Sequence, residues 1–165
     1  LARELKPILE DLQPIELLLE PGRFLLAPAG VLLVKVVDVK TVGGNRWAIV
    51  DGGGDLLIRA AYLENWYHEV IAFRDGVRLE GEPVTVSIGG PGCYAADVIA
   101  RDRELPALRE GDILAVMTTG AYTSCMTTPY TGRGRAASVW IDKTGRDFEV
   151  RRKQDVRGLY GFDVL

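Results

Sequence analysis

Hydrophobic positions in the first twelve residues follow the period of an α-helix. The apolar side chains fall at the i, i+3, i+4 and i+7 spacing of one helical face, at Leu5, Ile8, Leu9 and Leu12. Pro14 disfavours a helical conformation for the residue before it, so the helix should end there. The short apolar run at 15–19 is typical of a buried parallel strand. We therefore predict a helix over residues 1–12 and a strand over 15–19.

After residue 24 the pattern changes to short runs of β-branched and aliphatic residues, with no extended helical period. Clusters of glycine, aspartate and asparagine separate the runs, as expected for tight turns. Such spacing predicts a mainly β fold, an antiparallel β-sandwich or β-barrel. The eight predicted strands are Val31–Lys40, Trp47–Val50, Val70–Phe73, Val84–Ile88, Val98–Ala100, Ile113–Val116, Val139–Asp142 and Phe148–Arg152.

The change of pattern near residue 24 predicts two parts of unequal size. One helix and one strand cannot bury their own apolar faces, so residues 1–23 are expected to close a domain whose remainder lies upstream. Residues 24–165 are expected to form a β domain of their own. A first residue other than methionine fits this expectation.

Composition narrows the classes of partner. The 165 residues carry a formal net charge of −3, and the basic residues are scattered rather than gathered into a phosphate-binding stripe, so we expect no nucleic-acid partner. No run of 18 apolar residues occurs, so we expect no membrane span. The two cysteines are too few for a disulfide framework and fit a reducing compartment, so we expect a cytoplasmic protein.

The first candidate site is Glu20-Pro21-Gly22-Arg23, at the end of the apolar run. Sites of α/β proteins assemble where strands end. Gly22 permits a tight turn, and Arg23 can bind a phosphate or carboxylate with two parallel hydrogen bonds. The alternative is a solvated pair of Glu20 and Arg23, worth under about 1 kcal/mol.

Two further segments place reactive groups in loops. Gly90-Pro91-Gly92-Cys93 presents a thiol in a glycine-rich turn, where it is accessible for proton transfer. The alternative is a small buried side chain. Tyr122 follows a predicted strand and can offer its hydroxyl to a phosphate, or can pack at the rim of the fold.

Other candidates are weaker. Arg59 precedes an aromatic group that contains Tyr62 and ends at His68. We expect His68 to pack or to form hydrogen bonds rather than to act as a base. Because it is the one histidine in the sequence, a histidine-based metal site and Ser-His-Asp hydrolysis are both disfavoured. Cys125 has no neighbouring cysteine or histidine and is expected to be a packing residue.

The order of the motifs along the chain resembles the C-terminal part of the diaminopimelate and ornithine decarboxylase family, fold-type III enzymes that use pyridoxal 5′-phosphate. The resemblance extends from about residue 1 to residue 152. The motifs that carry it are Glu20-Pro21-Gly22-Arg23, Ala27-Pro28-Ala29-Gly30-Val31, Val50-Asp51-Gly52-Gly53, Ile58-Arg59, Tyr67-His68, Gly90-Pro91-Gly92-Cys93, Asp97-Val98, Leu105-Pro106, Glu110-Gly111-Asp112 and Gly120-Ala121-Tyr122.

This resemblance implies an N-terminal (β/α)8 barrel, of which residues 1–23 would be the last helix and strand. The lysine that holds the cofactor covalently would then lie in the barrel, outside this chain. The family's cysteine loop enters the partner subunit's site, so a homodimer with shared active sites is implied.

The resemblance also assigns roles to individual residues. Glu20 would face the pyridine nitrogen and keep it protonated, with Gly22 in the same cofactor-binding motif. Arg23 would hold the cofactor phosphate or a substrate carboxylate. Tyr122 would contact the phosphate and border the substrate. Arg59 would receive the substrate's distal carboxylate, and Cys93 would be the acid that reprotonates the α-carbon.

The sequence departs from the family pattern around the substrate. The family usually has an acidic residue directly after the cysteine, where it can bind a distal amino group, and here that position is Tyr94. A neutral phenol cannot form an ion pair with an ammonium group. Tyr62, one position from the family's substrate tyrosine, is a further candidate for substrate binding. These changes suit a different amino acid, such as a siderophore or antibiotic precursor.

Two other functions are consistent with the sequence. A fold-type III amino-acid racemase shares the two-domain plan, although Cys93 in its Gly-Pro loop favours decarboxylation. A β-sandwich interaction module could keep the fold without activity.

Overall fold

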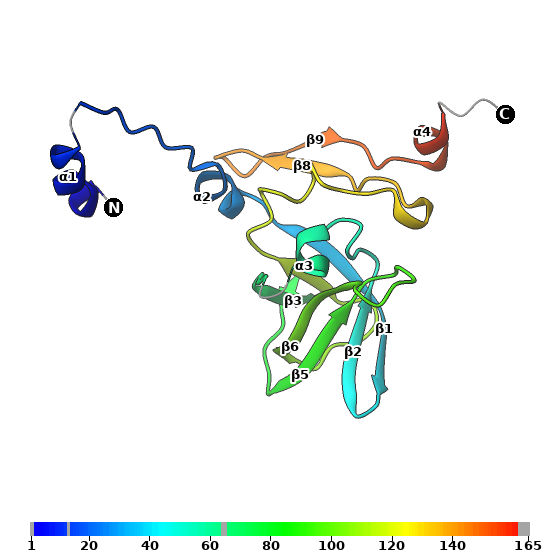
Figure 1. The fold of residues 1–165 in the computed structure, drawn as a ribbon. Coiled ribbons are helices and arrows are strands. Elements are labelled where there is room, and N and C mark those ends of the chain that lie inside the picture. Colours follow the sequence, from blue (N-terminus) through cyan, green and yellow to red (C-terminus); the bar gives the residue numbers. More distant parts are fainter. Residues whose placement is uncertain (1, 13, 64–65, 162–165) are drawn as a thin grey trace.

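The computed structural model describes residues 2–12, 14–63 and 66–161 (Figure 1). The helices are α1 (Ala2–Asp11), α2 (Gly22–Leu26), α3 (Ile58–Tyr62) and α4 (Val156–Tyr160), with short 3₁₀ turns η1 (Ala27–Ala29) and η2 (Tyr130–Gly132). The strands are β1 (Leu32–Val42), β2 (Asn45–Val50), β3 (Val70–Arg74), β4 (Val77–Arg78), β5 (Pro83–Gly89), β6 (Val98–Pro106), β7 (Ile113–Val116), β8 (Ser138–Ile141) and β9 (Asp147–Arg151).

Seven strands form one sheet in the order β4-β3-β7-β1-β2-β5-β6, while β8 and β9 form a separate hairpin. Every neighbouring pair is antiparallel except β2 and β5, which run parallel. Parallel neighbours need a long connection, and residues 51–82 provide it through α3, β3 and β4. The mainly β class is therefore confirmed, with a mixed sheet rather than a wholly antiparallel one.

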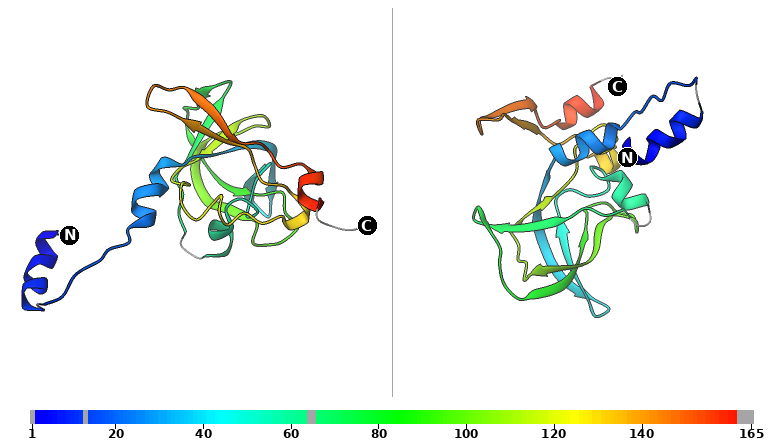
Figure 2. Two further views of the ribbon diagram at one scale, coloured as in Figure 1. Left: turned by 90° about the horizontal axis from the view of Figure 1, so that it is seen from above. Right: turned by 90° about the vertical axis from the view of Figure 1, so that its left-hand side faces the viewer.

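The large sheet curls until β3, near one edge, contacts β6 at the other edge (Figures 1 and 2). Aliphatic side chains from the inner faces of the strands fill the space inside the curl. Successive side chains of a strand point to opposite faces of the sheet, so every second residue of β1 enters this space. Val34 and Val36 are buried, while Leu33 and Val37 face solvent. The fully buried members of this core include Leu57, Ile88, Leu114 and Val116.

All eight predicted strands are present. The two-residue β1–β2 turn contains the residue type that its backbone favours, because Gly43 and Gly44 both have positive φ. β6 continues to Pro106, past the predicted end at Ala100. Sequence patterning underestimated this strand because residues 101–104 are all charged, and Asp102 interrupts the regular ladder with a φ of 48°.

At the end of the sheet where β7 begins, a buried carboxylate organises the chain. Asp112 accepts hydrogen bonds from Arg74 Nε at 2.8 Å and Nη2 at 2.9 Å, and from the Arg109 backbone N–H at 2.8 Å. The Arg74 guanidinium lowers the pKa of Asp112, so the carboxylate stays ionised. This network joins β3 to β7 and is structural.

The N-terminal segment differs from the sheet. The predicted helix is observed as α1, with Leu1 outside the described residues. The predicted strand over 15–19 is wrong for this structure, because the segment has no regular structure and Leu18 is 78% exposed. A strand needs a hydrogen-bonded neighbour, and no described strand lies beside this segment. Figure 2 shows α1 standing away from the sheet. None of the described helices is long and apolar enough to cross a bilayer.

Two glycines join α2 and η1 to the end of β7. The Gly120 N–H donates to the Ala27 carbonyl at 2.9 Å, and the Thr119 N–H donates to the Gly30 carbonyl at 2.8 Å. A Cβ atom on Gly120 would overlap the Leu26 carbonyl oxygen, and one on Gly30 would overlap the Gly120 backbone. Only glycine therefore permits this approach of the two segments.

Gly120→Ala should lower the stability of the protein by about 1–3 kcal/mol, because backbone atoms rather than a flexible side chain must move. Thermal unfolding measures the loss. Gly22→Ala is the matched control, since nothing lies within 4 Å of its added methyl group, and it should stay within about 0.5 kcal/mol of wild type. An unfolding midpoint of Gly120→Ala equal to that of the control contradicts the close approach.

Candidate active site

The topology collects the functional loops at one end of the curled sheet. β2 and β5 run parallel, and β7 runs in the same direction because β7 and β2 both pair antiparallel with β1. The segments after these three strands therefore emerge at one end, where β1, β3 and β6 begin. Every site residue predicted from residue 22 onward lies at this end.

The first group, which we call the arginine–tryptophan cluster, consists of Arg23, Arg59, Trp66 and Tyr122. The guanidinium carbons of Arg23 and Arg59 lie 4.0 and 4.4 Å from the centroid of the Trp66 ring. Arg59 also lies 4.7 Å from the ring centroid of Tyr122. Neither arginine forms a salt bridge with any acidic side chain in the described part of the chain. The cluster thus presents two positive charges to an incoming anion.

A buried histidine fixes the tryptophan of this cluster. The Trp66 Nε1–H donates to His68 Nε2 at 2.8 Å, so His68 carries its proton on Nδ1 and donates it to the Met117 carbonyl at 2.8 Å. His68 is 3% exposed. Burial lowers the pKa of His68, and the charges of Arg23 and Arg103 lower it further, so the ring stays neutral near pH 7. The expected hydrogen-bonding role of His68 is thus what the structure shows.

The second group, the tyrosine–cysteine cluster, consists of Tyr62, Cys93, Tyr94 and Tyr130. Tyr94 stacks on Tyr62 with a centroid distance of 5.8 Å and meets the Tyr130 ring edge-on at 5.0 Å. The Tyr130 hydroxyl lies 3.9 Å from Cys93 Sγ. This contact raises the pKa of Tyr130, so its hydroxyl keeps a proton that it can share with sulfur.

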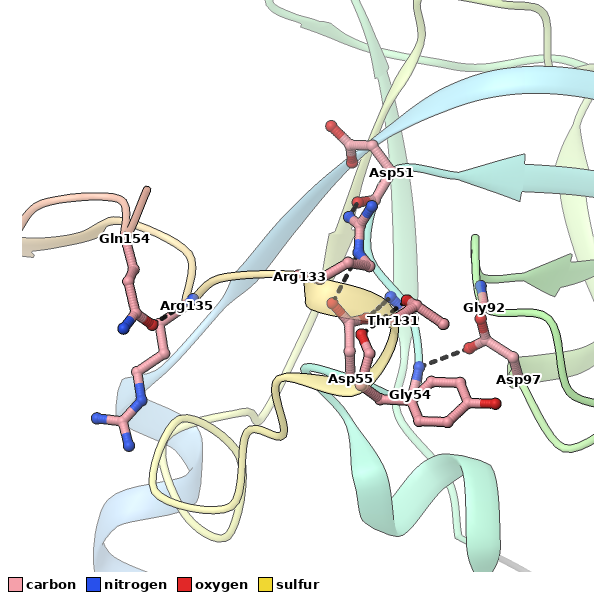
Figure 3. Close-up of polar contacts among 11 residues, drawn as sticks. Asp51, Gly54, Asp55, Gly92, Asp97, Thr131, Arg133, Arg135 and Gln154 are labelled. Atoms are coloured by element: carbon pink, nitrogen blue, oxygen red, sulfur yellow. Dashed lines mark hydrogen bonds and ion pairs between the residues drawn. The ribbon is translucent and has the colours of Figure 1, made fainter. Parts of the chain in front are cut away.

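Asp97 holds the cysteine loop in place. Its buried carboxylate accepts from the Gly54 N–H at 2.6 Å and from the Gly92 N–H, so one side chain joins the loops that follow β2 and β5 (Figure 3). Burial, and then the charge of Asp97, raise the pKa of Tyr94 far above its usual range. Tyr94 is therefore a neutral phenol at physiological pH.

A second polar contact fixes the loop that follows β7. Arg133 Nε donates to Asp55 Oδ2 at 3.0 Å, and Arg133 Nη2 donates to the Asp51 carbonyl (Figure 3). The Thr128 N–H also donates to the Asp55 carbonyl at 3.0 Å. Arg133 thus attaches the loop after β7 to the segment after β2. The same loop carries Tyr122 and Tyr130, which belong to the two clusters.

α3 connects the two clusters. Arg59 and Tyr62 are three residues apart on this helix, a spacing that places side chains about 5–6 Å apart at Cβ. Arg59 contacts the arginine–tryptophan cluster, and Tyr62 stacks on Tyr94 of the other cluster. Both clusters therefore contact α3.

The structure distinguishes several of the alternatives left by the sequence. Cys93 is exposed rather than buried. Arg23 stacks on Trp66, and no ion pair with Glu20 occurs among the described residues. Glu20 is exposed, and its carbonyl accepts from the Gly22 N–H at 2.8 Å. The expectation that Cys125 is a packing residue is wrong, because its side chain is exposed in the loop that follows β7.

Tyr122 has an unusual backbone. Its φ of 58° lies in the left-handed region, which costs a bulky residue of order 1–2 kcal/mol. Its side chain is 44% exposed and faces Arg59 rather than the core. Strained residues held in this way cluster at functional sites, which favours a binding role over rim packing.

Sequence reasoning gave no role to Trp66, Asp97 or Tyr130 within the site. Nothing in the local pattern indicates that the Trp66 ring would carry two guanidinium groups from segments 36 residues apart. Asp97 had one usable signal, its position between a glycine-rich turn and a strand, where a carboxylate can accept backbone N–H groups.

Comparison with known proteins decides the family. Residues 24–120 match the family described as pyridoxal-dependent decarboxylase, C-terminal sheet domain. The chain belongs to this family. It is 41% identical over 137 residues to a diaminopimelate decarboxylase of Pseudomonas aeruginosa, covering 83% of this chain and 32% of that protein. It is 36% identical over 164 residues to one of Vibrio cholerae, covering 99% and 38%.

A solved family structure shares the fold across the whole chain. The diaminopimelate decarboxylase of M. jannaschii in complex with L-lysine is 35% identical, with a TM-score of 0.84 over 99% of this chain and 36% of that one. The chain thus spans about a third of the length of the family members it matches.

The pH dependence of stability tests the state of His68. Burial lowers the pKa of His68 in the folded protein, whereas in the unfolded chain its pKa is about 6.5. Below about pH 6.5 the unfolded chain therefore binds a proton that the folded protein does not, which favours unfolding. The stability that depends on neutral His68 is therefore complete above about pH 6.5 and declines as the pH falls.

His68→Gln should remove this decline, because a glutamine amide can accept from Trp66 and donate to Met117 without titrating. Thermal midpoints of both proteins from pH 7.5 to pH 5 provide the measurement. Two curves of equal slope would show that His68 is not neutral and buried.

Proposed function

We propose that the complete protein is a pyridoxal phosphate-dependent amino-acid decarboxylase and that this chain supplies the C-terminal part of its active site. Membership of the family supports the reaction class. The observation that carries the proposal is that one end of the sheet collects the exposed thiol of Cys93 together with Arg23 and Arg59, which form no salt bridge within the described part of the chain.

The donor set fits the cofactor. Pyridoxal phosphate carries a phosphate dianion and a pyridine nitrogen, which require cationic or hydroxyl donors and a carboxylate. Arg23 and Tyr122 offer the first, and the exposed carboxylate of Glu20, with the turn at Gly22 beside it, offers the second. When bound, the cofactor withdraws electrons from the amino acid's α-carbon as carbon dioxide leaves. Glu20 would keep the pyridine nitrogen protonated.

Cys93 would then give a proton to the α-carbon. Its thiol is exposed at the site end of the sheet, and the Tyr130 hydroxyl lies 3.9 Å from its sulfur. After the proton leaves, Tyr130 can donate a hydrogen bond to the thiolate and lower the cost of its charge. Asp97 keeps the loop in position by holding Gly92.

The substrate would be an amino acid whose distal end meets Arg59, Tyr62 and Tyr94. Arg23 and Arg59 can bind its carboxylates with parallel hydrogen bonds. The stacked rings of Tyr62 and Tyr94 offer an aromatic surface, and the neutral phenol of Tyr94 is no counterion for a distal ammonium group. The relatives described above are diaminopimelate decarboxylases, and they give no support to a siderophore or antibiotic precursor as substrate.

The proposal includes the remaining expectations about organisation. Residues 1–23 would be the end of a barrel domain, which is supported by apolar side chains of α1 and of 15–19 that the sheet leaves exposed. A homodimer would share its active sites, so that the Cys93 loop serves the partner. A reduced Cys93 thiol requires a reducing compartment such as the cytoplasm, and both cysteines are free in the structure.

Release of carbon dioxide from an amino acid tests the reaction and separates a decarboxylase from a racemase or a binding module. In the complete protein, Cys93→Ala should lower kcat by about 10²–10⁴ while cofactor affinity stays near wild type, because only proton transfer is lost. Tyr130→Phe should lower kcat by about tenfold. Cys125→Ala is the matched control and should keep wild-type turnover. Full activity of Cys93→Ala would remove Cys93 from the acid role.

The role of Tyr94 can be tested with two substrates that differ only in the distal amino group, meso-diaminopimelate and 2-aminopimelate. Tyr94→Glu should raise the ratio of their kcat/KM values by about tenfold in favour of diaminopimelate, since a carboxylate can pair with the added ammonium. Tyr94→Phe keeps the ring and should leave the ratio unchanged. An unchanged ratio in the glutamate variant means that Tyr94 does not face the distal end.

A further inference from the structure

Trp66 connects a buried hydrogen-bond chain to two charged side chains. The chain runs from the Met117 carbonyl through both nitrogens of His68 to the Trp66 indole N–H. Each of its hydrogen bonds is 2.8 Å long, and His68 is buried. The Met117 N–H donates to the Glu69 carbonyl at 2.9 Å, so this series of hydrogen bonds is attached to the sheet where β3 and β7 meet. The indole therefore has a fixed orientation relative to the sheet.

Arg23 and Arg59 depend on this indole for their positions. Their guanidinium groups repel each other, and fixing a long arginine side chain costs conformational entropy. No described carboxylate offsets these costs through an ion pair, whereas the π-electrons of the Trp66 ring attract both cations. If the ring turned, the two cations would lose their common contact.

We propose that Trp66 is a positioning residue that His68 holds in place, and that it presents Arg23 and Arg59 as a paired site for one anionic group of the ligand, a carboxylate or a phosphate. The inference rests on the proposed function for the nature of that ligand. It adds two residues, Trp66 and His68, that act through the arginines rather than on the reacting atoms.

Four variants of the complete protein test the inference. His68→Leu removes both hydrogen bonds, and His68→Gln can restore both, because its amide accepts at oxygen and donates at nitrogen. Trp66→Phe keeps an aromatic face but removes the N–H that His68 holds. Trp140→Phe changes an exposed indole on β8 and is the matched control.

The first measurement separates binding from turnover. His68→Leu and Trp66→Phe should each raise KM by about tenfold and change kcat by less than about twofold, because an anion site is misplaced while the proton donor is not. His68→Gln and Trp140→Phe should keep the wild-type KM. If the KM and the cofactor affinity of both disrupting variants stay within about twofold of wild type, the inference is overturned, as it is by a loss confined to kcat.

The second measurement does not need activity. With 5-fluorotryptophan incorporated, the ¹⁹F resonance that Trp66→Phe removes should shift in His68→Leu and return in His68→Gln. Calorimetric titrations with glutarate and with inorganic phosphate should show an affinity about tenfold weaker in Trp66→Phe for at least one anion. A larger loss for glutarate identifies a substrate carboxylate as the occupant, and a larger loss for phosphate identifies the cofactor.

The two proposals fail in different ways. Unchanged affinity for both anions in Trp66→Phe overturns the positioning role, even if the wild-type protein releases carbon dioxide. If no amino acid yields carbon dioxide, the proposed function fails, and the anion titrations still decide the role of Trp66. Trp66→Phe keeps the test available if His68→Leu does not fold.

Discussion

The contact of the Gly30 and Gly120 backbones is the constraint on which the site depends. It holds the segment that carries Arg23 against the end of β7, immediately before Tyr122. Arg59, from a third segment, lies over both Trp66 and Tyr122. The arginine–tryptophan cluster therefore combines side chains from four places in the sequence, and the backbone contact fixes the relative position of two of them, Arg23 and Tyr122.

The two clusters divide the chemistry of the site by charge. The arginine–tryptophan cluster carries cations without described acidic partners, and its nearest buried base, His68, is neutral. The tyrosine–cysteine cluster consists of phenols around a thiol, next to the buried carboxylate of Asp97. An anionic ligand would be attracted to the first cluster and repelled by the charge near the second.

Local pattern predicted most of the fold and part of the site. Alternation and turn chemistry located all eight predicted strands, because each half-buried strand carries its own period. The parallel pairing of β2 with β5 is a long-range choice that no local window contains. The segment 15–19 reads as a strand from its composition but has no described partner. Among the site residues, glycine-rich turns revealed Cys93 and Gly22, whereas the place of Trp66 depends on contacts made only in three dimensions.

The one parallel pair also shapes how the domain reaches its native state. β1 can form a hairpin with β2 at once, because a two-residue turn joins them. The outer edge of β2, however, stays open until residues 83–89 arrive from beyond α3, β3 and β4. The chain loses conformational entropy when this long loop closes, before the contacts between β2 and β5 can offset that loss. Folding is therefore slower than for a simple meander. The loops that follow β2 and β5 are brought together by the same late event, so the candidate site forms only when the whole sheet has formed.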